Sequence, residues 1–392
     1  MPPGKYPVPG QPRAAGEGRL PGLDLVRAVA IAWVMLYHAS ILWRVPGDSW
    51  IVRFGWLGVD LFFVLSGFLI AGQLLRPWAR GTAPDYPRFI SRRLLRTIPA
   101  YLVVLAVYFF VPWLRDGTQM QPLWQFLTFT QNLALEPREV FSHAWSLCVE
   151  EQFYLVFPLV VAWLAWRPSA TKVMASIAGV LLFGICIRGY LWVHEVATTA
   201  QGVTVLNGIR FMSLIYYPTW SRLDALLAGV VVALVQTFRP GWWELLMAKA
   251  NLLSLCGVTG IAASMVFFGG QIAGFTATLF GYPLVAASAA LLVVAGSDRH
   301  SLIGRHAIPG AQALATGAYS LYLTHKMVYH AVQELGRHWS ANRQPFELAA
   351  GLLLALLVGS ALYWSVERPF LKLRDRLTMS RSLRAWDPVQ PR

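Results

Sequence analysis

Charged side chains are scarce in this chain. Asp, Glu, Lys and Arg together make up 13% of its 392 residues, whereas hydrophobic residues make up 56%. This composition excludes a domain folded around one core in water. Among the charged residues, acidic ones are the fewer, with 19 Asp and Glu against 33 Lys and Arg. Because the basic residues lie in short segments beside apolar runs, membrane topology and anionic lipid account for them, and nucleic acid is not expected as a partner.

Cysteine is also rare, and signs of a second domain are lacking. Cys148, Cys186 and Cys256 lie within apolar runs without CxxC spacing, so the sequence predicts neither a disulfide framework nor a metal site. No internal repeat or cleavable signal pattern is visible. The polar segments near 115–144 and 194–213 are too short to fold independently.

Long hydrophobic runs, by contrast, are abundant. A transmembrane helix needs about 20 mainly apolar residues, so the sequence predicts an all-α polytopic membrane protein with about ten spans. The predicted spans are 23–43, 54–75, 98–114, 145–166, 173–193, 214–237, 251–269, 272–296, 311–333 and 347–366.

The distribution of Lys and Arg predicts the orientation. Loops on the side of the N-terminus carry roughly three times as many Lys and Arg residues as loops on the other side, which predicts that both termini are cytoplasmic. We therefore expect a multi-pass protein of the cell (cytoplasmic) membrane. Residues 1–20 are expected to form a disordered cytoplasmic tail, 21–375 the transmembrane domain and 376–392 a basic cytoplasmic tail.

Several predicted spans contain ionisable residues, which mark functional sites by default because they are costly at membrane depth. In the first span, Arg27 and His38 are eleven residues apart. They therefore share one helix face, roughly 16 Å apart along the axis. Arg93 and Arg96 form an i,i+3 pair at the cytoplasmic start of the third span, where they suit phosphate oxygens or lipid headgroups.

Other polar residues leave alternatives open. Asp60 and Glu150 are candidate catalytic residues, predicted near the height of His38, where either carboxylate could orient the imidazole. For Asp60, a structural ion pair is the alternative. Arg222 and Asp224 are candidate substrate-binding residues, but they cannot face each other at i,i+2, so each is expected to pair with another helix. In the ninth span, Tyr322 and His325 are candidate substrate-binding residues, and Lys326 is predicted to reach the outer face.

The motifs together resemble acyltransferase family 3. They are the R-x10-H pattern of Arg27 and His38, GVDLFFVLSGFLI, RRLLR before IPAY, WSLCVEEQFY, SRLDALLAG, YSLYLTH and VERPF, in the family order over about residues 20–375. The resemblance implies an O-acyltransferase, acyl-CoA (in the first place acetyl-CoA) as donor and a cell-envelope saccharide as acceptor. It implies that His38 is the essential histidine, Arg27 its partner, Arg93 and Arg96 the CoA phosphate ligands, and Glu150 the motif glutamate. It also implies a stand-alone form without an SGNH-type domain.

The residues and the resemblance agree on a mechanism. The nucleotide would be held by arginines at the cytoplasmic end while the pantetheine arm extends toward His38, which acts as a general base or as an acyl carrier. Two alternatives remain at this stage: a lipid or secondary-metabolite glycoside as acceptor, or a transporter of an anionic or glycosylated solute. The oligomeric state is not predicted.

Overall fold

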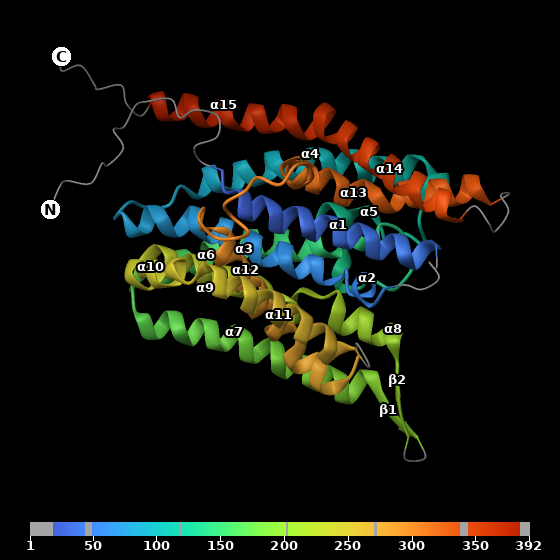
Figure 1. Cartoon of the computed structure of the whole chain (residues 1–392), viewed down its shortest axis with the longest axis horizontal. Helices are drawn as coiled ribbons and strands as arrows, with labels where there is room; N and C mark the ends of the chain where they lie inside the picture. The colour runs from blue at the N-terminus through green and yellow to red at the C-terminus, as the bar shows by residue number, and fades with distance from the viewer. Residues whose placement is uncertain are drawn as a thin grey trace.

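The computed structural model is a bundle of long helices (Figure 1) and describes residues 19–43, 49–117, 119–200, 203–269, 273–337 and 344–384. Its α-helices are α1 (Pro21–Trp43), α2 (Trp50–Arg53), α3 (Leu57–Ala79), α4 (Tyr86–Phe110), α5 (Leu123–Leu127), α6 (Trp145–Trp166), α7 (Ala170–Leu191), α8 (Gly208–Phe211), α9 (Leu223–Phe238), α10 (Pro240–Ala248), α11 (Ala250–Phe268), α12 (Tyr282–Gly296), α13 (Ala311–Gly336), α14 (Gln344–Leu362) and α15 (Arg368–Arg384).

Short irregular turns and one hairpin connect or extend these helices. The 3-10 turns are η1 (Pro112–Leu114), η2 (Gln131–Leu133), η3 (Ser142–Ala144) and η6 (Thr219–Ser221). The π-helical turns are η4 (Trp192–Val196), η5 (Met212–Tyr216), η7 (Ala277–Gly281) and η9 (Tyr363–Glu367). An antiparallel hairpin of β1 (Ala197–Ala200) and β2 (Val203–Leu206) pairs Ala197 with Leu206. The sequence did not predict this hairpin.

The helices confirm an all-α polytopic membrane protein. Within the described residues, eight helices are long and apolar enough to cross a membrane, and the pair α9 and α10, bent by 110°, can supply a ninth. The ninth predicted span, 311–333, corresponds to α13, which is long enough to cross a membrane but less apolar than the others because it carries polar residues such as His325 and Lys326. Together with α13, these helices correspond to the predicted spans.

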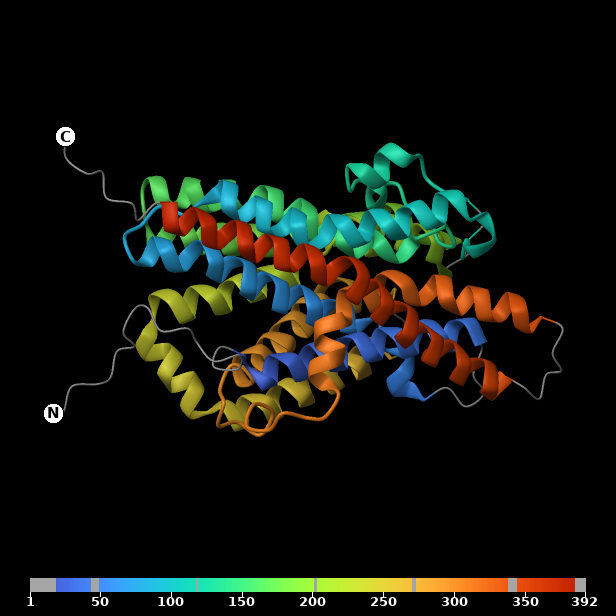
Figure 2. The same cartoon turned by 90° about the horizontal axis from the view of Figure 1, so that it is seen from above.

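Successive long helices run in opposite directions along the bundle. Figures 1 and 2 show α1 and α4 running from the left end to the right, with α3 and α6 returning. The start of α1 and the end of α15 lie toward the same end of the bundle, as predicted for two termini on one side. Residues 1–18 of the predicted N-terminal tail lie outside the described residues. In the predicted basic C-terminal tail, residues 376–384 continue α15, and 385–392 lie outside the described part.

Two helix boundaries differ from the prediction for local reasons. Helix α4 begins at Tyr86, not near residue 98, because the Asp85 side chain accepts a hydrogen bond from the backbone N–H of Arg88 and a proline occupies its first turn. The arginine cluster is therefore helical. Helix α9 begins only at Leu223, because Pro218 and η6 precede it.

Small residues bring α3 into close contact with its neighbours. A Cβ added to Gly67 would lie 2.1 Å from the Leu226 carbonyl oxygen, and one added to Gly229 would lie 2.2 Å from that of Val64. Glycine at both positions lets α3 and α9 pack backbone to backbone. This close approach of the two backbones holds α3 in place.

Candidate functional site

Two cavities lie one behind the other along the bundle. The arginine cavity, of about 310 Å³, is lined by residues that include Arg27, Arg93, Arg96 and Glu150. The histidine cavity, of about 440 Å³, is lined by residues that include His38. Helices α1, α3, α6 and α13 each contribute residues to both cavities. Arg27 and His38, predicted to share one face of α1, therefore open into different cavities.

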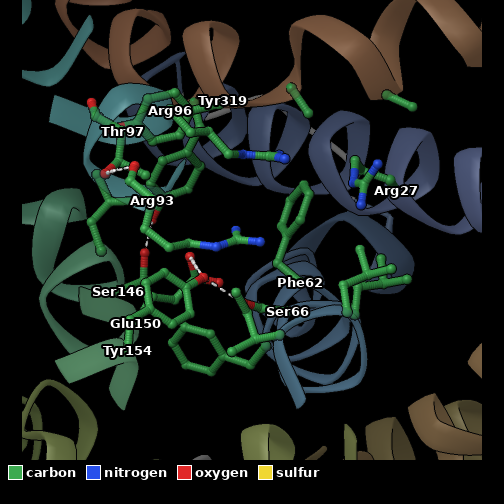
Figure 3. Close-up of a pocket in the computed structure, with 18 of the residues that line it drawn as sticks. Arg27, Phe62, Ser66, Arg93, Arg96, Thr97, Ser146, Glu150, Tyr154 and Tyr319 are labelled. Atoms are coloured by element: carbon green, nitrogen blue, oxygen red, sulfur yellow. Dashed lines mark hydrogen bonds between the residues drawn. The ribbon is translucent and has the colours of Figure 1, made fainter. Parts of the chain in front are cut away.

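The arginine cavity is strongly cationic. Figure 3 shows the guanidinium groups of Arg27, Arg93 and Arg96 directed into one space. Arg92 and Arg374 also line it, whereas Glu150 is the one carboxylate in its described lining. Arg93 lies over the ring of Tyr154, 5.5 Å from its centroid, so it packs inside the bundle. Such an excess of positive charge around a cavity suits a ligand with several negative charges.

Glu150 belongs to the arginine cavity and does not orient His38. Its Oε2 accepts a hydrogen bond of 2.9 Å from the Tyr154 hydroxyl, which in turn bonds to Ser66. Figure 3 shows these three side chains together on one wall. The predicted contact between Glu150 and His38 was wrong. Two residues at a similar height along the bundle can still point in different directions, because their helices can be rotated differently about their axes. Of the two adjacent glutamates, only Glu150 lines the cavity.

Asp60 also lies away from His38, because it is held in an ion pair. Arg222 Nη2 donates to both Asp60 oxygens, at 3.0 and 3.1 Å, and its guanidinium lies 4.2 Å from the Tyr282 ring centroid. Asp224 pairs with Arg188 at 2.6 Å. The prediction that Arg222 and Asp224 pair with other helices is confirmed. Neither these two residues nor Asp60 appear in the described lining of either cavity.

The partner of His38 is His325. His325 Nδ1 lies 2.8 Å from the Tyr322 carbonyl oxygen, and His325 Nε2 lies 2.9 Å from His38 Nδ1. A carbonyl only accepts, so Nδ1 of His325 carries the proton, and Nε2 of the neutral ring is then an acceptor. His38 must therefore donate from Nδ1, which leaves its Nε2 with a free lone pair. This tautomer is the one that a general base or nucleophile requires.

A third histidine, His143, was missed by the sequence reasoning. It lies in η3 just before α6, with its ring centroid 5.1 Å from that of His325 and 6.4 Å from that of His38. Its backbone carbonyl accepts a 2.7 Å hydrogen bond from the Tyr322 hydroxyl. The available signal was a histidine two residues before the WSLCVEEQFY motif. No group of His, Cys, Asp or Glu in the described residues has an arrangement that could hold a metal ion.

An ion pair supports the far wall of the histidine cavity. Lys326 Nζ lies 2.8 Å from Asp116 and 3.0 Å from the Ser142 hydroxyl, and Asp116 also accepts from the backbone N–H of Phe141. Burial alone would raise the pKa of Asp116, but the Lys326 ammonium and these hydrogen bonds hold it below its ordinary value. Lys326 thus reaches a loop residue at the end of the bundle, in line with the predicted outward direction.

The chain belongs to a family of membrane acyltransferases. A family model described as an acyltransferase domain matches residues 20–364, which agrees with the motif resemblance and supports an acyltransferase over the transporter alternative.

Particular relatives are O-acetyltransferases. The chain is 28% identical to the O-acetyltransferase OatA of Staphylococcus aureus (strain NCTC 8325), over 90% of this chain and 57% of that protein. It is 25% identical to the peptidoglycan O-acetyltransferase OatA of Listeria monocytogenes, over 78% of this chain and 49% of the relative. The chain thus spans about half the length of the curated relatives it matches. No solved structure matches it.

Proposed function

We propose that the protein transfers an acetyl group from acetyl-CoA to a hydroxyl group of a cell-envelope saccharide, with His38 as the general base. The observation that carries this proposal is the pair of neighbouring cavities. One is polycationic, and the other contains His38, whose hydrogen bond to His325 assigns the proton to Nδ1 and leaves Nε2 free. Both are built from α1, α3, α6 and α13, so one substrate can reach His38 from each end.

The arginine cavity is suited to the nucleotide end of CoA. Arg93 and Arg96 lie one turn apart on α4, and Arg27 faces them from α1. Guanidinium groups bind phosphate oxygens in pairs, and CoA carries phosphates at both its diphosphate and its ribose. The pantetheine arm would then follow the bundle axis over roughly the 16 Å rise between Arg27 and His38. Since α4 begins at the arginine-rich end, this cavity would open to the cytoplasm.

The histidine cavity is suited to a sugar. Its lining is rich in aromatic rings, among them Tyr37, Trp56, Trp145 and Tyr216. Flat apolar faces with polar edges bind ligands that combine C–H faces with hydroxyl groups. The printed name of the Listeria relative places its activity on peptidoglycan, which supports a glycan of the cell envelope as acceptor here.

The reaction needs one proton transfer and one acyl transfer. His38 Nε2 removes the proton of the acceptor hydroxyl while its oxygen attacks the thioester carbonyl. The C–S bond then breaks, and the thiolate of CoA takes the proton from His38 as it leaves. The products are the O-acetyl saccharide and free CoA. His325 stabilises the charged imidazole by accepting the Nδ1 hydrogen bond.

The test is transfer by purified protein in lipid nanodiscs. Acetyl-CoA and solubilised peptidoglycan fragments are supplied, and both free thiol and acetylated glycan are measured. The proposal predicts both products from wild-type protein and a rate lower by about 10²–10⁴-fold for His38→Ala. Wild-type protein that consumes no acetyl-CoA, or His38→Ala protein that acetylates glycan at the wild-type rate, would overturn it.

A further inference from the structure

Two arginines of the arginine cavity come from helices that pack side by side. Arg92 is on α4, and Arg374 is the one residue of α15 in the described lining of the cavity. Helix α15 packs against α4, and Figures 1 and 2 show it running back toward the end of the bundle where α4 begins. The two guanidinium groups are close enough to interact electrostatically. Arg92 and Arg374 therefore form one cationic pair, the outer pair.

Contacts of α13 show where α15 begins relative to α4. The Ser320 hydroxyl donates to Glu367, at the end of η9, with a distance of 2.6 Å. The hydroxyl of the adjacent Tyr319 donates to the Thr97 carbonyl oxygen of α4 at 2.8 Å. Because neighbouring residues of α13 make these two contacts, the start of α15 lies at a height close to that of Thr97.

From this height, the outer pair lies toward the start of α4 and away from His38. Arg374 is seven residues beyond Glu367, a rise of about 10 Å along α15. Arg92 precedes Arg96 by four residues, about 6 Å along α4 in the same direction, since the two helices are antiparallel. His38 lies in the opposite direction, because α1 and α4 run in parallel and His38 is near the far end of α1.

The Arg374 side chain is turned into the protein, although α15 is largely exposed. Its side chain is 18% exposed, against 55% for that of Asp375. The Asp375 carboxylate lies 2.8 Å from Arg374 Nη2 and accepts from Nε at 2.9 Å, which holds the guanidinium at the edge of the cavity. An ion pair with so exposed a carboxylate is weak, so a phosphate group of a ligand can compete with it.

The covalent structure of CoA fixes the order of its phosphates. From the thioester, the pantetheine arm leads to the diphosphate, and the diphosphate leads to the ribose that carries the 3′-phosphate. With the thioester at His38, the 3′-phosphate is therefore the phosphate group farthest from His38. A phosphomonoester carries about two negative charges at neutral pH, which suits two guanidinium groups from different helices.

We propose that Arg92 and Arg374 bind the 3′-phosphate of CoA, while Arg27, Arg93 and Arg96 bind its diphosphate. This inference depends on the proposed function, since it takes the arginine cavity as the donor site and places the thioester at His38. Arg374 lies beyond residues 20–364, the part that the acyltransferase family model matches. The donor site thus includes a residue from outside the matched domain.

The test compares the binding of two ligands that differ by one phosphate group, CoA and 3′-dephospho-CoA. Dissociation constants are measured by isothermal titration calorimetry on protein in phosphatidylcholine nanodiscs. Arg374→Gln removes one cation of the outer pair. Arg376→Gln is the matched control, because Arg376 is exposed on the same helix and is absent from the described lining of the cavity. Arg93→Gln is the second comparison, because both ligands carry the diphosphate.

We expect wild-type protein to bind CoA about 100-fold more tightly than 3′-dephospho-CoA, since two charge-assisted contacts are lost with the phosphate. Arg374→Gln should lower this ratio about 10-fold by weakening the binding of CoA alone. Arg376→Gln should keep the wild-type ratio. Arg93→Gln should weaken the binding of both ligands by a similar factor.

Two results would overturn the assignment of the 3′-phosphate. Arg374→Gln protein may keep the wild-type ratio, which would place the Arg374 guanidinium against lipid headgroups, or it may lose affinity for both ligands equally. The proposed function fails separately, if wild-type protein shows the expected preference for CoA but transfers no acetyl group. Wild-type protein that binds neither ligand would overturn both.

Discussion

The arginine cavity and the histidine cavity are made by the same helices but differ in chemistry. The first has five arginines and one carboxylate in its described lining. The second is rich in aromatic rings, contains His38 and Arg138, and has its lysine paired with Asp116. The arginine cavity is thus suited to hold a polyanion and the histidine cavity to hold a hydroxyl-rich ligand. The difference suggests that donor affinity and chemistry can be altered separately.

The largest expected effect is the loss of His38. His38→Ala should lower transfer by about 10²–10⁴-fold, the contribution of a general base. Binding of acetyl-CoA should stay unchanged, because the arginines lie in the other cavity. Isothermal titration with acetyl-CoA alongside the transfer assay separates the two quantities. Loss of acetyl-CoA binding in this variant would show that the cavities are not independent.

The Asp60–Arg222 pair should matter for stability. Removing one partner of a buried pair costs about 3–5 kcal/mol, so Arg222→Met should lower the midpoint of thermal unfolding in detergent strongly. The material that remains folded should keep its turnover rate. Folded Asp60→Asn protein with wild-type stability and no activity would assign Asp60 to the chemistry.

Loss of the arginine pair should affect the donor alone. Arg93→Ala combined with Arg96→Ala removes two charge-assisted contacts of about 1.5–3 kcal/mol each, so the KM for acetyl-CoA should rise about 100-fold or more. The KM for the acceptor should change little. Arg80→Ala combined with Arg88→Ala is the matched control, since neither residue lines a cavity. Equal effects in the two double variants would contradict a phosphate site.

A smaller effect is expected at His325, which positions His38. His325→Phe leaves the His38 Nδ1–H without its acceptor and should lower kcat about 10-fold at an unchanged KM for acetyl-CoA. His325→Gln, whose amide oxygen can accept the same hydrogen bond, should recover part of the rate. A purely structural role would predict no such recovery.

The smallest effect concerns the ion pair in the outer loop. The pKa of Asp116 is lowered in the folded protein, so its carboxylate stabilises the fold above the ordinary Asp pKa of about 3.9, and this contribution is lost as the pH falls through the lower folded value. Thermal unfolding of wild-type and Asp116→Asn proteins should therefore differ at pH 7 and converge in acid. A difference independent of pH would contradict the ion pair.

The sequence predicted what depends on spacing along one helix. The shared face of Arg27 and His38, the i,i+3 pair of Arg93 and Arg96, and the need of Arg222 and Asp224 for partners on other helices all follow from helical periodicity. Contacts across helices did not follow, because periodicity does not specify which way a helix is rotated against its neighbours. For this reason Glu150 was wrongly expected beside His38, whereas for Asp60 the sequence left two alternatives open and the structure shows one of them, the ion pair. His143 was missed because it lies in a 3-10 turn outside any regular pattern.

The most direct test of the account is a cryo-electron microscopy structure with a non-transferable acetyl-CoA analogue. The account predicts the CoA phosphates against Arg93 and Arg96, the pantetheine arm extending along the bundle toward His38, and the acyl carbon within about 4 Å of His38 Nε2. An analogue bound with its phosphates away from the arginine cavity, or with its acyl end remote from His38, would contradict it.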